Sequence, residues 1–113
     1  MKISFIVPSW HYYSDPSKHQ PFWEIYYATN LKKQGYDVSV HDMRSIESLN
    51  FTDHANKIPE SDFYFYWIFK SGDAAEIYSI AKYLKEKFPK STHAAGGTHV
   101  DMCQDESKDF FDS

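Results

Sequence analysis

The sequence has one cysteine and four glycines, and these low counts exclude several kinds of site. Cys103 has no partner for a disulfide within the chain, which is typical of a protein in a reducing cytoplasm. The same count excludes a cysteine-rich zinc site or an iron–sulfur cluster held by cysteines of this chain. No Gly-x-Gly-x-x-Gly follows the first predicted strand, so an NAD site is not expected.

Long apolar runs and an excess of basic charge are also missing. No apolar segment approaches the roughly 20 residues that span a bilayer. The short apolar start before Pro8 has no cleavage site after it, so we interpret it as a strand rather than a signal peptide. The formal charge is −4, without a basic stripe for a nucleic-acid backbone. We therefore expect neither a membrane nor a nucleic acid as partner.

Aromatic residues, in contrast, are abundant at 19% of the 113 residues. Aromatic side chains dominate protein cores, and a surface for a flat ligand is the alternative interpretation. The length suits one domain of roughly 100–150 residues, so we treat residues 1–113 as a single α/β domain. Because the chain stops at Ser113, where a fifth strand would begin, we expect it to be a fragment of a longer chain.

Strand-like and helix-like segments alternate along the chain. The predicted strands are 3–8, 37–42, 63–69 and 93–96, and the predicted helices are 21–33, 53–58, 73–88 and 105–111. Segment 63–69 has the strongest strand signal and is placed centrally, whereas the alternating segment 37–42 is placed at a sheet edge. Alternation of this kind predicts a parallel sheet with helices on both faces. The expected fold is a flavodoxin-like, Rossmann-like three-layer sandwich with strand order 2-1-3-4 and a missing or truncated fifth strand.

The candidate ligand site follows from this fold. In open α/β sheets, ligands bind beyond the carboxyl ends of the strands, where the strand order reverses. Three loops, 9–20, 70–72 and 96–99, are expected at that edge. The candidate binding residues are Ser9, Trp10, His11, Ser71, Gly72, Gly96, Gly97, Thr98 and His99.

Each of these candidates also has a purely structural interpretation. Gly96 and Gly97 let a bulky ligand approach the backbone, or they form a tight turn that needs positive φ. Ser71 and Thr98 can hydrogen-bond a phosphate or an amide, although Ser71 can equally cap the following helix. Trp10 and the other aromatic residues of the first loop can cover a flat macrocycle or form an exposed loop.

Two segments carry a recognisable pattern. Residues 20–38 contain Gln-Pro-Phe-Trp and then Leu-Lys-Lys-Gln-Gly-Tyr-Asp-Val, and residues 94–100 read Ala-Ala-Gly-Gly-Thr-His-Val. In order and spacing they resemble the N-terminal cobalamin (B12)-binding domain of B12-dependent radical SAM proteins, with its Pro-Pro-Leu-Gly-Leu, Leu-Lys-Lys-x-Gly-Tyr-x-Val and Gly-Gly-Pro-His-Val motifs. Asp112 lies where that family often has a Phe-Asp pair. The sequence departs from the family at Thr98, which replaces Pro, and in the partly kept Pro-Leu-Gly-Leu segment.

The resemblance implies a cobalamin-binding module, metal-binding through the corrinoid's cobalt, with no catalytic residue of its own. A C-terminal radical SAM domain of a longer, methyltransferase-like chain would carry the iron–sulfur cluster and S-adenosylmethionine. His99 would contact the nucleotide-tail side of the corrinoid, whereas its structural interpretation is a solvated loop histidine. The first loop, although it contains His11, lacks Asp-x-His-x-x-Gly, and the partial match around His93 lies on a strand. We therefore expect no histidine of this chain to coordinate the cobalt.

Two other functions stay open. A domain that kept the fold but lost the cofactor would serve as an interaction module, which the altered Gln-Pro-Phe-Trp segment and the aromatic first loop allow. The N-terminal half of a nucleotide-sugar transferase also opens with a strand, a loop and a helix, but the Gly-Gly-Thr-His element argues against it. No Ser–His–Asp, paired-carboxylate or phosphate-loop arrangement is recognisable in the sequence, so no residue receives a catalytic role.

Overall fold

The sheet is parallel and has the predicted strand order. The computed structural model describes residues 1–7, 22–43, 55–68, 71–97, 100, 103–108 and 110–112. Its elements are β1 (Lys2–Val7), α1 (Phe22–Lys33), β2 (Asp37–Asp42), β3 (Phe63–Trp67), α3 (Ser71–Lys87), β4 (Thr92–Gly96) and α5 (Gln104–Ser107). The strands follow the order β2-β1-β3-β4, and all pair in parallel. The predicted α/β class and strand order are confirmed.

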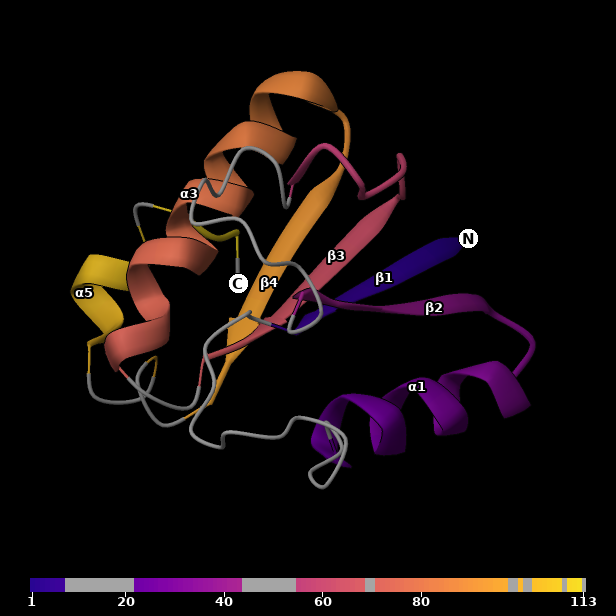
Figure 1. Ribbon diagram of the computed structural model, residues 1–113. Coiled ribbons are helices and arrows are strands. Elements are labelled where there is room, and N and C mark those ends of the chain that lie inside the picture. The colour runs from indigo at the N-terminus through magenta and orange to yellow at the C-terminus, as the bar shows by residue number, and fades with distance from the viewer. Residues whose placement is uncertain are drawn as a thin grey trace.

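Helices cover both faces of this sheet. In Figure 1, α3 and α5 lie together on one side, whereas α1 lies on the other side beneath β2 and β1. This is the three-layer arrangement that the alternation of strands and helices predicts. None of the helices in the described part of the chain is long and apolar enough to cross a membrane.

Local sequence accounts for the inner strand β1 and for the end of helix α1. In β1, every residue from Ile3 to Val7 is buried, as expected for a strand covered on both faces. Helix α1 stops at Gly35, which has φ 97° and donates its N–H to the carbonyl of Lys32 at 3.0 Å. A left-handed residue after the last turn is the usual way to end a helix, and glycine adopts it without a Cβ penalty.

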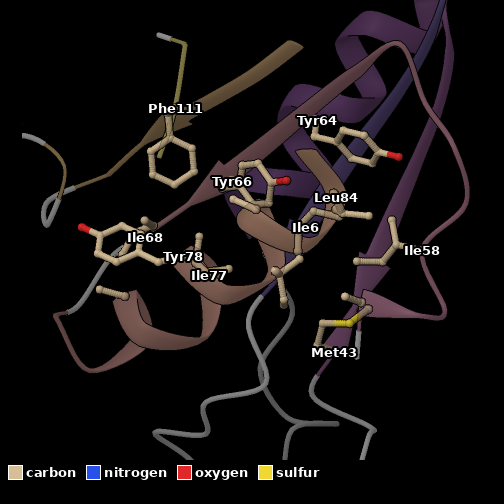
Figure 2. Packing of buried hydrophobic residues seen from close by; sticks show 14 residues of the cluster. Ile6, Met43, Ile58, Tyr64, Tyr66, Ile68, Ile77, Tyr78, Leu84 and Phe111 are labelled. Atoms are coloured by element: carbon tan, nitrogen blue, oxygen red, sulfur yellow. The ribbon is translucent and has the colours of Figure 1, made fainter. Parts of the chain in front are cut away.

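The main core lies between the sheet and α3. Tyr64 and Tyr66 of β3 point to this side and are fully buried, as are Ile77 and Leu84 of α3. Figure 2 shows these side chains gathered around Ile6 of β1, which contributes from the centre of the sheet. Because a strand alternates its side chains between the two faces, every second residue of β3 belongs to this core.

A smaller apolar cluster lies on the α1 face. Its buried members are Ile3 and Phe5 of β1 and Ala28 of α1. Partly buried residues surround them, among them Leu31 of α1 and Phe65 of β3. The two faces of the sheet are therefore covered unequally.

The last described residues close the outer edge of β4. The backbone N–H of Asp112 donates to the carbonyl of His93 at 2.7 Å, and the Asp112 carboxylate accepts the N–H of His93 at 2.8 Å. Phe110 stacks on Tyr78 with ring centroids 4.1 Å apart, and Phe111 packs on Tyr66 at 5.3 Å. The prediction of a helix over 105–111 is wrong beyond Ser107, because these two phenylalanines turn inward to bury their rings.

We predict that truncation costs more on the α3 face than on the α1 face. Leu84→Ala should lower the free energy of unfolding by about 2–5 kcal/mol, because it opens a cavity in the main core. Leu31→Ala should cost about 1 kcal/mol, because Leu31 is already partly exposed. Urea unfolding of both variants measures the difference, and equal losses would contradict the unequal covering of the two faces.

Candidate functional site

The strand order reverses between β1 and β3. The chain passes from β1 to β2 on one side and then crosses to β3 on the other side of β1. Trp67 and Gly96, the last residues of β3 and β4, are register partners at the carboxyl edge of the sheet. Helix α3 begins at Ser71, soon after β3 ends. This is the edge at which open α/β sheets bind ligands.

Part of the predicted site is described by the structure. Ser71 and Gly72 open α3, Gly96 ends β4, and Gly97 follows it, so these four residues belong to the carboxyl edge as predicted. Ser9, Trp10, His11, Thr98 and His99 lie outside the described residues. The binding role of all nine stays a prediction. Since α3 begins at Ser71 rather than at Asp73, the sequence pattern placed the start of this helix two residues too late.

The backbone at position 97 requires glycine, whether or not a ligand binds. Its φ is 109°, and a Cβ at this position would lie 2.5 Å from the carbonyl oxygen of Ile68. The N–H of Ile68 in turn donates to the carbonyl of Gly96 at 2.8 Å. A Cβ on Gly96 would meet only the rings of Phe65 and Trp67, at 3.5 Å. The turn therefore requires glycine at position 97 but tolerates a side chain at position 96.

We predict that alanine is tolerated very differently at these two neighbouring positions. Gly97→Ala should lower the free energy of unfolding by about 2 kcal/mol or more, because it adds both a backbone strain and a clash with Ile68. Gly96→Ala should change it by no more than about 0.5 kcal/mol, because its Cβ makes ordinary contacts. Thermal and urea unfolding measure both. Equal effects of the two substitutions would be incompatible with the described turn.

The α1 face carries an aromatic cleft that the sequence analysis did not predict. Its volume is about 650 Å³, within the range of small-molecule pockets. The cleft is lined by Met1, Ile3, Phe5, Tyr27, Asn30, Leu31, Gln34, Tyr36, Phe63, Phe65 and Trp67, none of which has a charged side chain. Its floor consists of alternate residues of β1 and β3, and α1 forms one wall.

Ring contacts run continuously along this cleft. The centroid of Phe65 lies 5.3 Å from that of Phe5 and 6.4 Å from that of Trp67. Tyr27 of α1 lies 6.3 Å from Trp67 and 5.5 Å from Tyr26. The aromatic row thus extends from the sheet floor to the outer surface of α1. The sequence predicted β3 as a central strand, but not that its residues on the α1 face would be only partly buried.

His93 is buried within the main core rather than exposed to a ligand. Its ring stacks on those of Tyr64 and Tyr66, with centroids 5.1 and 5.9 Å away. Nδ1 lies 2.9 Å from the Tyr66 hydroxyl, and Nε2 has no hydrogen-bond partner among the described residues. Burial, assisted by the charge of Lys85 and opposed by that of Asp112, lowers the pKa of His93 to about 4. A neutral, enclosed imidazole of this kind is a core residue.

A second polar cluster ties β1 to the neighbouring segments. The Ser4 hydroxyl lies 2.6 Å from that of Ser61 and 3.2 Å from Nε2 of His41, and the Ser39 hydroxyl lies 3.1 Å from the same nitrogen. Burial, assisted by the charge of Lys2, lowers the pKa of His41. Because Ser4 and Ser61 are both buried, the cluster stabilises the sheet instead of presenting a nucleophile.

We predict that His93 makes stability pH-dependent. The unfolded chain binds a proton near pH 6.5, whereas the folded chain resists protonation down to about pH 4. Stability is therefore complete above pH 6.5 and falls as the pH drops from 6.5 towards 4. The loss should be about 3 kcal/mol, because each unit of difference between the unfolded and folded pKa of His93 corresponds to about 1.4 kcal/mol.

Replacing the histidine provides the control. His93→Phe retains a stacking ring but cannot titrate, so the difference in unfolding free energy between pH 7 and pH 4.5 should shrink by most of this amount. His41, whose pKa is also lowered, accounts for part of the slope that remains. An unchanged pH slope in the variant would show that His93 is not the group responsible.

In the part of the chain that the structure describes, no three His, Cys, Asp or Glu side chains gather as they would around a metal ion. Comparison of the chain with protein-family models, with curated proteins and with solved structures finds no match.

Proposed function

We propose that this chain is the cobalamin-binding module of a B12-dependent radical SAM enzyme. The observation that carries the proposal is the reversal of strand order between β1 and β3. Open parallel sheets bind ligands beyond the carboxyl ends of their strands at such a point. The segments that resemble the B12-binding family, above all residues 94–100, include the turn that follows β4 at this same edge.

The described part of the edge suits the polar tail of a corrinoid. Helix α3 has 17 residues and begins at Ser71, so the N–H groups of its first turn and its dipole favour a negatively charged group. Gly97 has its positive φ immediately before Thr98 and His99 in the sequence. The resemblance to the B12-binding family implies that His99 contacts the nucleotide-tail side of the corrinoid.

The residues of this chain would bind and orient the cofactor without a catalytic step of their own. Bound cobalamin supplies cobalt chemistry of the kind used in methyl transfer or rearrangement. The backbone of Ile68 occupies the space beside Gly97, so Gly97 does not make room for the corrinoid ring. Gly97 instead allows the backbone turn that follows β4. His93 is enclosed in the core, and we propose that the corrinoid binds without a protein histidine on its cobalt.

The proposal includes a partner. A C-terminal radical SAM domain in a longer chain would hold the iron–sulfur cluster and S-adenosylmethionine and would receive the corrinoid face that this module presents. An interaction module that has lost the cofactor is the second candidate. The aromatic cleft on the α1 face favours it, because a large apolar surface is typical of a protein contact.

We predict that the chain binds hydroxocobalamin. Titration should change the UV–visible spectrum of the corrinoid, and the corrinoid should elute with the protein in gel filtration. His99→Ala should weaken binding about tenfold through the loss of one polar contact.

Two other histidines serve as controls. His54→Ala, outside the three candidate loops, should leave the affinity unchanged, and His11→Ala should leave the spectrum of the bound corrinoid unchanged because no histidine ligates the cobalt. Absence of both a spectral change and corrinoid retention would reject the proposal and leave the interaction module.

A further inference from the structure

The α1 face of the sheet is incompletely covered. Phe63, Phe65 and Trp67 of β3 point to this side and are partly exposed, whereas Tyr64 and Tyr66 on the other side are fully buried. In Figure 1, α1 lies beneath β2 and β1 and leaves the region of β3 and β4 on its side of the sheet without a helix among the described elements. Parallel sheets normally bury both faces.

Exposed apolar side chains gather on the same side. Among the described residues, five large hydrophobic side chains are exposed: Met1 at 73%, Tyr26 at 51%, and Ile25, Tyr27 and Tyr36 at 39% each. Met1, Tyr27 and Tyr36 line the aromatic cleft, and Tyr26 contacts Tyr27 on the outer surface of α1. Ile25 is on the same helix but lies about 200° around its axis from Tyr27, so it points away from the cleft. We call the other four residues, Met1, Tyr26, Tyr27 and Tyr36, together with the cleft, the aromatic face.

The size of the aromatic face suits an interface between two proteins. At roughly 200 Å² per aromatic side chain, the exposed parts of the three tyrosines amount to roughly 250 Å². Met1 raises the total to roughly 400 Å², before the half-buried rings on the cleft floor are counted. A specific interface buries about 800 Å² per partner, so these few side chains supply about half of it.

The chemistry of the aromatic face makes it complementary to itself. The cleft lining contains no charged side chain, and its one charged group is the α-ammonium of Met1, so little repulsion between like charges opposes a second copy there. Its polar groups include the amides of Asn30 and Gln34, each of which is both a hydrogen-bond donor and an acceptor. An amide can therefore pair with the same amide of a second copy, as a two-fold interface requires.

We infer that the chain forms a two-fold symmetric homodimer through the aromatic face. The α1 helix of each copy packs against the cleft of the other, with Tyr26 entering from the outer surface of the helix. The second copy thereby covers the rings of β3 that α1 leaves partly exposed. This interface lies on a face of the sheet and not at its carboxyl edge, so the inference stands whether or not the chain binds a corrinoid.

Sedimentation velocity over protein concentrations from about 1 to about 500 μM tests the inference. The wild-type chain should shift from monomer to dimer as concentration rises. Tyr26→Glu places a carboxylate in the apolar cleft of the other copy and should raise the dissociation constant at least tenfold. Asn30→Asp, nearly isosteric and in the cleft lining, should act in the same direction. Ser79→Glu adds the same charge at an exposed position of α3, on the opposite side of the sheet, and should leave the dissociation constant unchanged.

Circular dichroism separates loss of association from loss of fold. If Tyr26→Glu unfolds the chain, the dissociation constant of Asn30→Asp tests the interface instead, because this substitution preserves the shape of the side chain. A sedimentation coefficient of a monomer over the whole concentration range would overturn the inference. A dimer that Ser79→Glu weakens as strongly as the folded cleft variants would also overturn it, since the contact would then lie elsewhere.

Discussion

The position of β1 between β2 and β3 is the constraint on which the rest of the structure depends. β1 pairs in parallel with both neighbours and is buried on both faces from Ile3 to Val7. Parallel pairing requires crossovers. The crossover from β1 to β2 through α1 and the crossover from β3 to β4 through α3 run in opposite directions along the sheet, which places α1 and α3 on opposite faces. Because the strands are parallel, the ends of β3 and β4 and the start of α3 lie at one edge of the sheet. The proposed ligand site is the part of this edge where the strand order reverses.

The two faces of the sheet are covered unequally. The α3 face therefore contributes most to the stability of the chain, and the α1 face presents apolar side chains at the surface. The α3 face holds the main core, with two tyrosines of β3, the neutral His93 and the inward-turned Phe111. The α1 face holds few buried residues and a row of aromatic rings that reaches the surface. Removal of core side chains should therefore unfold the chain, whereas changes on the aromatic face should alter what the chain contacts. A corrinoid at the carboxyl edge and a second copy on the aromatic face use different surfaces and are compatible with each other.

Local sequence signals predicted the architecture well because they depend on neighbouring residues. The stop at Gly35, the alternation in 37–42 and the β-branched and aromatic strands need no tertiary information. Features that depend on distant contacts were missed. The last helix ends at Ser107 because Phe110 and Phe111 find rings on α3 and β3, and the aromatic cleft exists because α1 covers only part of the sheet. Of the candidate site, the sequence predicted the edge and four residues that reach it.

Backbone NMR during titration with hydroxocobalamin tests the central claim most directly. The account predicts shifts at the amides of Gly72, Gly96 and Gly97, at the carboxyl edge, and unchanged signals at Asp62 and Ser91, which lie just before β3 and β4 at the opposite edge. Shifts confined to the opposite edge, or unchanged signals throughout at saturating cobalamin, would contradict a corrinoid site at the point where the strand order reverses.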